Sequence, residues 1–344
     1  MKQNKGEWSE LYAVLYLLLN NKLKIVNSKL EIQNSEIFTV RNIVMLGKEK
    51  VKFNVLDYDI EITNSNVSNK ISKISIEEYL KNILEHIKNT KETTFEIKEL
   101  NKLFKYFNKI KGSSNIKEDV ILINFDNIQK IIAELGYSIK SKLGRPATIL
   151  NSSNHTNFVY KIKNFDEKNI EIINNINTKS KLLDRIKKIK ELGGKIEFLS
   201  IESKQFEENL KMIDSLLPLI LGEVLLKSYI ENEKDLKLLF QSNSLYGQKI
   251  VEKKMGDFLE AISFGMFPGE AWNGFNSVKG GIILVTLDGN VYILDLIYNR
   301  EEVIKYLINE TKLDTPSSSR YNMLNLKKVG NDILFTLNLQ VRYK

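Results

Sequence analysis

Hydrophobic residues recur at helical spacing close to the N-terminus. Trp8, Leu11, Leu15 and Leu18 are three or four residues apart, and this spacing predicts an amphipathic helix over Trp8–Asn20. Similar spacing predicts further mainly helical segments at Ile76–Lys88, Ile97–Ile110, Phe165–Ile173, Lys179–Leu192, Phe206–Ser228 and Tyr246–Ser263. The polar stretch Lys111–Asn115 is predicted to be a loop.

Strands are predicted where short runs of β-branched and aromatic residues lie between turn signals. These runs are Phe38–Met45, Val51–Val55, Asp59–Ile62, Asp119–Phe125, Gly136–Ser141, Asn157–Ile162, Lys195–Ser200 and Ile333–Val341. Gly281–Leu287 and Val291–Ile297 predict a hairpin around the turn pair Asp288-Gly289, followed by a helix. The mixture of elements predicts an α/β protein.

The chain shows no internal repeat and no low-complexity linker that would separate domains. We therefore expect one interwoven unit over residues 1–344. Within it we expect a catalytic core at about 1–165, a helical region at about 166–265, and a β-rich part at about 266–344 that completes the core and contributes to recognition.

Composition limits the chemistry that the chain can perform. It contains no cysteine and only two histidines, which excludes disulfides, thiolate metal sites and a histidine-rich zinc site. Any metal chemistry must use carboxylates, and these favour hard ions such as magnesium or manganese.

The net charge of +8 raises the expectation of a nucleic-acid partner, because lysines that neutralise phosphates release counterions. The alternative is that an AT-rich genome has enriched the chain in Lys, Asn and Ile. No apolar run reaches the roughly 18 residues that a bilayer requires. Met1–Gly6 has no hydrophobic segment of a signal peptide behind it, so we expect a cytoplasmic protein without a membrane partner.

Candidate catalytic residues lie on two of the predicted strands. Asp119 stands where a loop enters one strand, and Ser138 and Lys140 project from the same face of the next. Phosphodiester hydrolysis needs a carboxylate to hold a divalent ion and a lysine to orient or deprotonate water. The alternative is a strand-edge aspartate and an exposed lysine without catalytic roles.

A further carboxylate lies beside the apolar stripe of the first helix. Glu10 can reach the sheet edge on which that helix packs, and Glu7 lies one turn earlier on the same face as its competitor. A carboxylate in the first turn of a helix is also favoured by the helix dipole, which suits Glu7 better than Glu10.

Five segments resemble the HpaII-type restriction endonucleases, in order and nearly from end to end. They are NKGEWSELY (Asn4–Tyr12), LGYSIKSKLGRPATILNSSNHTNF (Leu135–Phe158), AWNGFNSVKGGIILV (Ala271–Val285), TKLDTPSSSRYNM (Thr311–Met323) and FTLNLQVRY (Phe335–Tyr343). The resemblance implies a PD-(D/E)xK nuclease core, a mixed central sheet flanked by helices, with a helical insertion and a β-rich C-terminal part. It also implies magnesium and double-strand cleavage within CCGG.

By this resemblance, Asp119 is the aspartate of the motif, Lys140 its lysine, and Glu10 the helix glutamate of many nucleases in the superfamily. Asp119 and Glu10 would then hold the metal. The usual second acid is replaced by Ser138, whose neutral hydroxyl binds magnesium more weakly than a carboxylate does. Glu10 or Glu7 is the expected source of the missing charge.

Two polar segments are candidates for reading DNA, and each contains one of only six arginines. A bidentate arginine matches the paired acceptors of guanine, and small polar side chains suit contacts to phosphates and groove edges. The candidate residues are Arg145, Thr148, Asn151, Ser152 and His155 in one segment, and Ser318 and Arg320 in the other. The alternative is that both are solvated turns.

A palindromic target predicts a homodimer on double-stranded DNA with a short G·C site. Two other functions remain open, namely a repair or junction nuclease without sequence specificity and a DNA-binding protein without catalysis. Ser138 is the sequence feature that favours the last of these.

Overall fold

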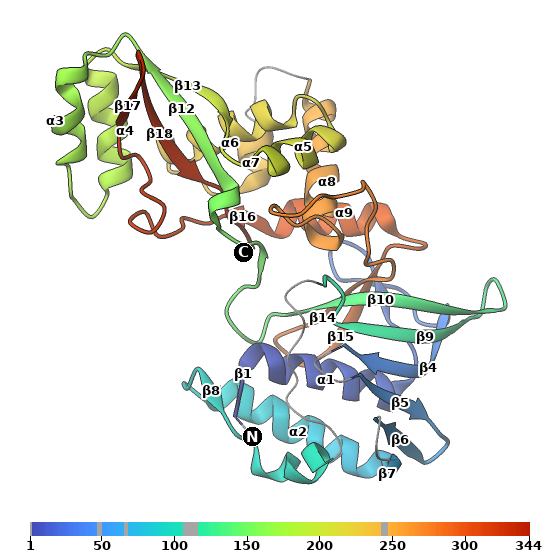
Figure 1. The fold of residues 1–344 in the computed structure, drawn as a ribbon. Helices are drawn as coiled ribbons and strands as arrows, with labels where there is room; N and C mark the ends of the chain where they lie inside the picture. The colour runs from blue at the N-terminus through green and yellow to red at the C-terminus, as the bar shows by residue number, and fades with distance from the viewer. Residues whose placement is uncertain (1, 47–49, 65–67, 106–115, 242–246) are drawn as a thin grey trace. The chain divides into compact units, whose positions relative to one another are not determined.

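The chain folds into two units, and each of them takes two stretches of sequence. A computed structural model describes residues 2–46, 50–64, 68–105, 116–241 and 247–344. Unit 1 comprises Met1–Ala147 and Asn276–Tyr306, and unit 2 comprises Thr148–Phe275 and Leu307–Lys344. Segments distant in sequence therefore build each unit (Figure 1).

Unit 1 is organised around a ten-stranded sheet. In spatial order its strands are β3 (Ile32–Asn34), β2 (Ile25–Val26), β15 (Val291–Asp295), β14 (Gly281–Val285), β10 (Ile131–Ser141), β9 (Val120–Asp126), β4 (Phe38–Met45), β5 (Val51–Val55), β6 (Asp59–Thr63) and β7 (Ser68–Ser72). Strand β10 runs parallel to β14 and β15 runs parallel to β2, whereas the other pairs are antiparallel. The sheet is therefore mixed, as expected.

Helix α1 (Lys5–Asn20) packs its apolar side against this sheet and against α2 (Lys73–Asn89). Trp8, Leu11 and Leu15 are almost fully buried, which confirms the helix predicted from their spacing. The helix begins at a capping box and ends where Asn21 adopts a left-handed conformation with φ 47°. The N-terminal strand β1 (Gln3–Asn4) pairs with β8 (Thr94–Phe95).

The structure differs from the helix predicted over Ile97–Ile110 in the part of this segment that it describes. Lys98–Lys105 forms a 3-10 helix, η1, and residues 106–110 lie outside the described residues. The predicted loop Lys111–Asn115 lies outside them as well.

The predicted hairpin forms between β14 and β15, and α9 (Arg300–Glu310) follows it. A glycine is required at its first residue. Gly281 has φ +120°, and a Cβ there would lie 2.1 Å from the carbonyl oxygen of Leu294 on the neighbouring strand. The absence of a side chain thus allows β15 to approach β14.

Unit 2 contains two smaller sheets. One has the order β13 (Lys195–Ile201), β12 (Asn157–Lys163), β18 (Asp332–Asn338), β17 (Lys327–Val329), and the other has the order β11 (Thr148–Leu150), β19 (Val341–Tyr343), β16 (Thr311–Leu313). Its helices are η2 (Asn154–Thr156), η3 (Glu167–Asn169), α3 (Ile170–Asn174), α4 (Lys181–Glu191), α5 (Lys204–Ile213), α6 (Leu217–Ile230), α7 (Leu236–Gln241) and α8 (Gln248–Phe264).

Two predicted elements of unit 2 are divided in the structure. The segment Phe206–Ser228 forms two helices, because Pro218, the second residue of α6, has no N–H group to donate within a helix continued from α5. The strand predicted at Ile333–Val341 is divided after Asn338, whose side chain donates to the Ser153 carbonyl and to the Asn157 side chain. Strand β18 ends at Asn338, and β19 joins the other sheet.

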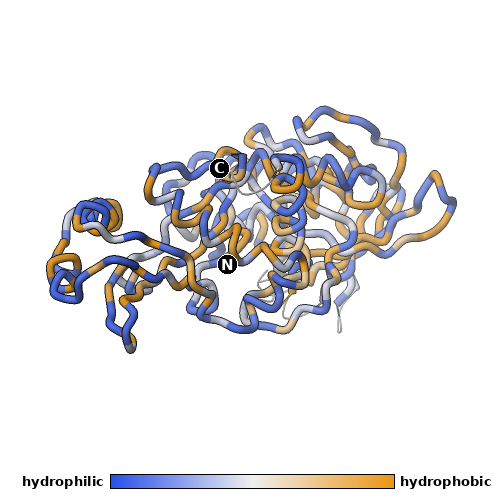
Figure 2. The backbone as a smooth tube through the Cα atoms, turned by 90° about the horizontal axis from the view of Figure 1, so that it is seen from above, coloured by the Kyte–Doolittle hydropathy of each residue, from blue (hydrophilic) through white to orange (hydrophobic). Residues whose placement is uncertain are grey.

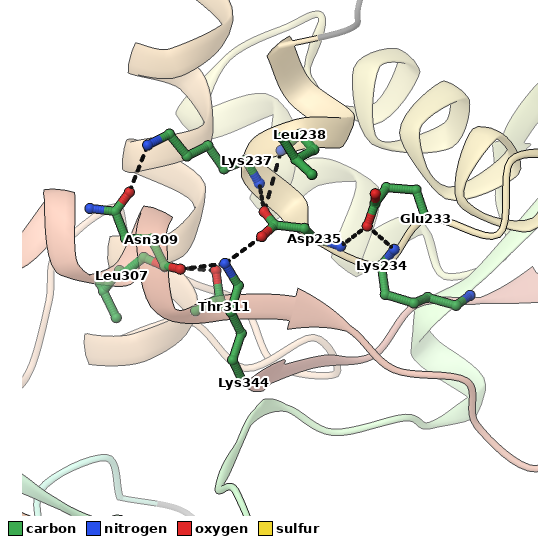
Figure 3. Close-up of polar contacts among 9 residues, drawn as sticks. All are labelled: Glu233, Lys234, Asp235, Lys237, Leu238, Leu307, Asn309, Thr311 and Lys344. Carbon is green, nitrogen blue, oxygen red and sulfur yellow. Dashed lines mark hydrogen bonds and ion pairs between the residues drawn. The ribbon is translucent and has the colours of Figure 1, made fainter.

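The last residue of the chain is anchored within unit 2 (Figure 3). The Lys344 ammonium donates to the Asp235 carboxylate and to the Asn309 carbonyl. The other oxygen of Asp235 accepts from the Lys237 N–H at 2.9 Å, and the Lys237 side chain reaches Asn309 at 2.9 Å. These contacts connect the start of α7 with the end of α9.

Hydrophobic positions are interspersed with hydrophilic ones along the described residues, as the orange and blue segments of Figure 2 show. Among the described residues, no helix is long and apolar enough to span a membrane.

Candidate active site

A cavity of about 670 Å³ lies in unit 1 where α1 begins and β10 ends. Four separate stretches of chain form its walls. They contribute Asn4, Lys5, Gly6, Ser9 and Glu10; Thr90, Lys91, Glu92 and Thr93; Asp119; and Ile139, Lys140, Ser141, Leu143, Gly144, Arg145 and Ala147. The cavity therefore collects Glu10, Asp119 and Lys140, three of the predicted catalytic residues.

The sheet register brings Asp119 to the predicted catalytic strand. Strands β9 and β10 are antiparallel neighbours, and Val120 lies opposite Tyr137. The Asp119 N–H donates to the Tyr137 carbonyl at 2.9 Å. Its carboxylate Oδ2 accepts from the Ile139 N–H at 2.6 Å and from the Ser138 hydroxyl at 3.2 Å. The carboxylate is thus held by the main chain as well as by a side chain.

Ser138 connects the lysine to the aspartate. Lys140 Nζ donates to the Ser138 Oγ at 2.6 Å, and Nζ lies 4.0 Å from Asp119 Oδ2. Ser138 is buried, whereas the side chains of Lys140 and Asp119 retain 24% and 23% of their exposure. The charged groups can therefore contact a ligand that enters the cavity, and the buried serine holds both of them in position through its hydroxyl group.

Glu10 faces this group from α1. Burial and the nearby negative charge of Asp119 raise the pKa of Glu10 to about 8, while the charge of Lys140 acts in the opposite direction. A nearby cation would stabilise the ionised form of this carboxyl group, because its positive charge would offset both the cost of burial and the repulsion from Asp119.

Glu7 has a different position. Its carboxylate accepts from the Asn4 N–H at 2.9 Å, and the Asn4 side chain accepts from the Glu7 N–H at 2.9 Å. This reciprocal pair caps α1, and Glu7 does not line the cavity. The two glutamates share one helix face, but only the side chain of Glu10 lines the cavity.

Two features of the site were missed by sequence reasoning. Burial, and then the positive charge of Lys140, lower the pKa of Lys117 to about 8. Its place two residues before Asp119 was the available signal. The wall formed by Thr90–Thr93 follows α2 and comes from a stretch that carries no nuclease-like pattern of its own.

The predicted DNA-reading residues are divided between the units. Arg145 is exposed and lines the cavity in unit 1. In unit 2, the Tyr321 hydroxyl donates to the Ser152 carbonyl at 3.0 Å, which brings the loops that carry Ser152 and Arg320 together. Arg320 is exposed, and its N–H donates to the Ser317 hydroxyl. Sequence reasoning missed the role of Tyr321.

The remaining predicted DNA-reading residues have varied surroundings. The Thr148 hydroxyl accepts from the Arg342 guanidinium at 3.4 Å, and Arg342 pairs with Asp314 at 3.1 Å. These contacts hold the Thr148 side chain within the small β11-β19-β16 sheet. Asn151 and His155 are exposed, and Ser318 is half-buried.

Among the described residues, no three histidine, aspartate or glutamate side chains gather closely enough to hold a metal ion. A metal beside Lys140 would therefore be held by the carboxylates of Asp119 and Glu10 together with neutral oxygens, water or substrate. Magnesium is commonly bound by one or two carboxylates and by phosphate oxygens. The residues present fit this pattern.

Comparison with known proteins covers almost the whole chain. The family model of the HpaII restriction endonuclease matches residues 4–343. The chain is also 32% identical over 355 residues to the type II restriction enzyme HpaII of Haemophilus parainfluenzae. That alignment covers 99% of this chain and 98% of the relative. No solved structure matches the chain significantly.

Proposed function

The chain belongs to the HpaII restriction endonuclease family and is a type II site-specific deoxyribonuclease, and we propose that it hydrolyses both DNA strands in the cavity that contains Glu10, Asp119 and Lys140. The hydrogen-bonded series Lys140–Ser138–Asp119 beside the half-buried Glu10 is the observation that carries this assignment.

We propose that unit 1 is a PD-(D/E)xK nuclease core. The support is the arrangement of its mixed sheet. The aspartate enters one central strand, the lysine lies on the antiparallel neighbour, and α1 packs on the same sheet. Ser138 occupies the position of the usual second acid, and Glu10 supplies a carboxylate from the helix instead.

Asp119 and Glu10 are the residues that would hold Mg²⁺. Magnesium would supply polarisation of the scissile phosphate and acidification of a water molecule. Asp119 directs Oδ2 toward the Ile139 N–H and the Ser138 hydroxyl, so Oδ1 is the oxygen that we assign to the ion. Glu10 contributes the second negative charge that the serine cannot provide.

Lys140 acts on the water and the phosphate in this proposal. Its ammonium is held beside Asp119 through Ser138, with part of its surface exposed to the cavity. From there it would orient the attacking water and offset negative charge that develops on the phosphate. Ser138 touches no substrate in this arrangement and acts as a positioning residue.

The proposed target is CCGG, following the resemblance to the HpaII family. A site made only of G·C pairs requires donors for guanine N7 and O6. Arg145 in the cavity wall and Arg320 in unit 2 are the proposed bidentate donors. The polar residues around them, Thr148, Asn151, Ser152, His155 and Ser318, are proposed to contact phosphates and groove edges. A palindromic site would be occupied by a homodimer on DNA.

Digestion of a plasmid with known CCGG sites in the presence of Mg²⁺ tests the proposal, and sequencing of the fragment ends identifies the cut. Discrete fragments that begin or end within CCGG support it. Diffuse degradation would indicate a nuclease without sequence specificity. Binding without cleavage would indicate a DNA-binding protein without catalysis, and discrete fragments with other ends would refute the proposed target alone.

A further inference from the structure

Residues 151–155 form a loop between β11 and β12 that contributes no apolar side chain to the core. Every residue between Leu150 and Phe158 is polar, and both Asn154 and His155 are exposed. Burial of apolar surface, the main force that fixes a folded chain, therefore does not fix this loop, which we call the 151–155 loop. Its order depends on hydrogen bonds.

Three buried polar side chains lie beside this loop. Thr156 and Asn338 are fully buried, and Asn157 is 7% exposed. Asn338 Nδ2 donates to the Ser153 carbonyl and to Asn157 Oδ1, at 2.7 Å in each case. The Thr156 hydroxyl accepts from the Ser153 N–H at 3.1 Å, and its own hydrogen can reach the Ser153 carbonyl at 3.1 Å or Asn338 Oδ1 at 3.2 Å. We call Thr156, Asn157 and Asn338 the buried polar cluster.

Further hydrogen bonds join the same loop to the C-terminal part of unit 2. Strand β12 pairs with β18, and the Leu339 N–H, directly after β18, donates to the Thr156 carbonyl at 2.9 Å (Figure 1). The Tyr321 hydroxyl donates to the Ser152 carbonyl at 3.0 Å. Groups from two distant segments of the chain therefore hold the loop along its length.

The ring of His155 is restrained as well, although this residue is exposed. Its Nδ1 lies 3.4 Å from the hydroxyl of Ser203, which caps α5. A Cβ on Gly269 would lie 2.9 Å from the ring, so the absence of a side chain at Gly269 leaves room for it. The loop thus presents an exposed side chain in a defined position.

We propose that the buried polar cluster positions the 151–155 loop for base recognition, and that Thr156 and Asn338 are positioning residues for sequence discrimination. This role rests on the DNA contacts proposed above for Ser152 and His155. Buried polar groups cost free energy unless they are hydrogen-bonded, whereas a fully bonded cluster gives rigidity. A loop that only joined two strands would not need such a cluster.

Rigidity matters for base recognition because hydrogen bonds to base edges are directional. A loop that is already ordered forms them without a further loss of conformational entropy. Contacts to phosphates depend mainly on charge and tolerate more movement. Loosening the 151–155 loop should therefore weaken binding to the cognate site more than binding to other DNA.

Matched threonine variants of the full-length protein test this role. Thr156→Val keeps the shape of the side chain but removes the hydroxyl. In Ca²⁺ it should lower the affinity for the cognate duplex about tenfold and leave the affinity for an unrelated duplex within about twofold of the parent. Thr156→Ser keeps the hydroxyl and should discriminate like the parent. Thr311→Val is the control and should do the same, because Thr311 is also fully buried in unit 2 but its hydroxyl donates to the Leu307 carbonyl.

Amide hydrogen exchange of the same variants without DNA reports the order of the loop. Thr156→Val removes the acceptor of the Ser153 N–H and should speed exchange there at least about tenfold. Thr156→Ser and Thr311→Val should exchange at nearly the rate of the parent. Because this measurement needs no DNA, it separates a failure of the positioning from a failure of the proposed function. A parent protein that binds all duplexes alike would refute the proposed recognition itself.

Tyr321→Phe tests the same role if Thr156→Val does not fold, since it removes a hydrogen bond to the loop from a half-buried side chain. It should speed exchange in the 151–155 loop and lower discrimination about threefold. Unchanged discrimination despite faster exchange, in either variant, would overturn the proposal. So would unchanged exchange in whichever of the two variants folds, or an equal loss of discrimination in Thr311→Val.

Discussion

The contacts of the Lys140 ammonium group indicate its role. Its ammonium is fixed by the buried Ser138 hydroxyl at 2.6 Å and lies 4.0 Å from Asp119. A lysine that only covered the surface would not need a buried partner. The arrangement instead holds a positive charge in the cavity wall, where we propose that a phosphate binds.

We predict that Lys140→Ala retains DNA binding and lowers the cleavage rate by at least about two orders of magnitude, because the group that we propose orients the water is removed. Single-turnover cleavage of a duplex with one site measures the rate, and binding is measured in Ca²⁺. Lys142→Ala is the control from the same segment and should cleave at nearly the normal rate. Normal cleavage by Lys140→Ala would refute the assigned strand.

The two glutamates of α1 provide a matched pair for the second prediction. Glu10→Gln removes the charge that is proposed to replace the missing acid, and should reduce cleavage by about two orders of magnitude. Glu7→Gln preserves an acceptor for the capping box and should leave both cleavage and thermal stability close to normal. If Glu7→Gln abolishes cleavage and Glu10→Gln does not, the roles are reversed.

The proposed metal dependence rests on the carboxylates of Asp119 and Glu10. We predict no cleavage in chelator, cleavage in Mg²⁺, and specific binding without cleavage in Ca²⁺. Asp119→Asn should remain inactive in Mg²⁺ even at high concentration. Cleavage in chelator by the purified protein would exclude this mechanism.

At the scale of elements, the central sheet carries a buried acid near the end of β15. Asp295 is fully buried, and its Oδ2 accepts from the Tyr298 N–H at 2.7 Å. Its Oδ1 has no hydrogen-bond partner in the part of the chain that the structure describes. Burial raises the pKa of Asp295 to about 6, and the charge of Asp126 contributes in the same direction.

This raised pKa predicts the pH dependence of folding stability. The folded protein binds the proton more tightly than the unfolded chain, so this group lowers stability above about pH 6 and the loss is recovered as pH falls toward 4. We predict that Asp295→Asn is more stable than the parent by roughly 1–3 kcal/mol at pH 8, with a smaller difference at pH 5. Urea unfolding at several pH values measures this.

Asp57→Asn is the control for this experiment, because Asp57 is exposed. Its unfolding curve should follow that of the parent at each pH. A difference for Asp295→Asn that stays constant from pH 5 to pH 8 would contradict the prediction and indicate a change in packing instead of a change in charge.

At the scale of the whole molecule, the scarce arginines of the two candidate recognition segments lie in different units. Arg145 belongs to unit 1 and Arg320 to unit 2. The proposed catalytic residues belong to unit 1, so variants of the two arginines test the contribution of each unit to recognition separately.

We predict that Arg145→Ala and Arg320→Ala each lose about 1–3 kcal/mol of discrimination between the G·C site and singly substituted duplexes. Binding in Ca²⁺ at several salt concentrations measures discrimination and total affinity together. Lys142→Ala and Lys312→Ala are controls. Each should weaken binding to all duplexes alike and reduce the salt dependence of binding by about one unit. If both arginine variants behave like these controls, the two segments only position the DNA backbone.

Much of the local structure could be predicted from the chain alone. The helix at Trp8–Asn20, the strand that follows Asp119 and the hairpin at Asp288-Gly289 appear close to their predicted bounds, whereas the strand that carries Lys140 begins at Ile131, before the predicted Gly136. Each depends on side-chain periodicity or on a turn pair within a few residues, and such patterns act locally.

Tertiary structure decided which residues meet. It separated Glu10 from Glu7, although both lie on one helix face, because the cap at Asn4 engages Glu7. It also brought Thr90–Thr93 into the cavity wall and tied the end of β18 to a distant segment, because the Asn338 side chain donates to the Ser153 carbonyl and to the Asn157 side chain. The residue types in the sequence thus determined the available chemistry. The geometry of the site was determined by contacts between segments far apart in the chain, because the periodicity of the sequence contains no information about such contacts.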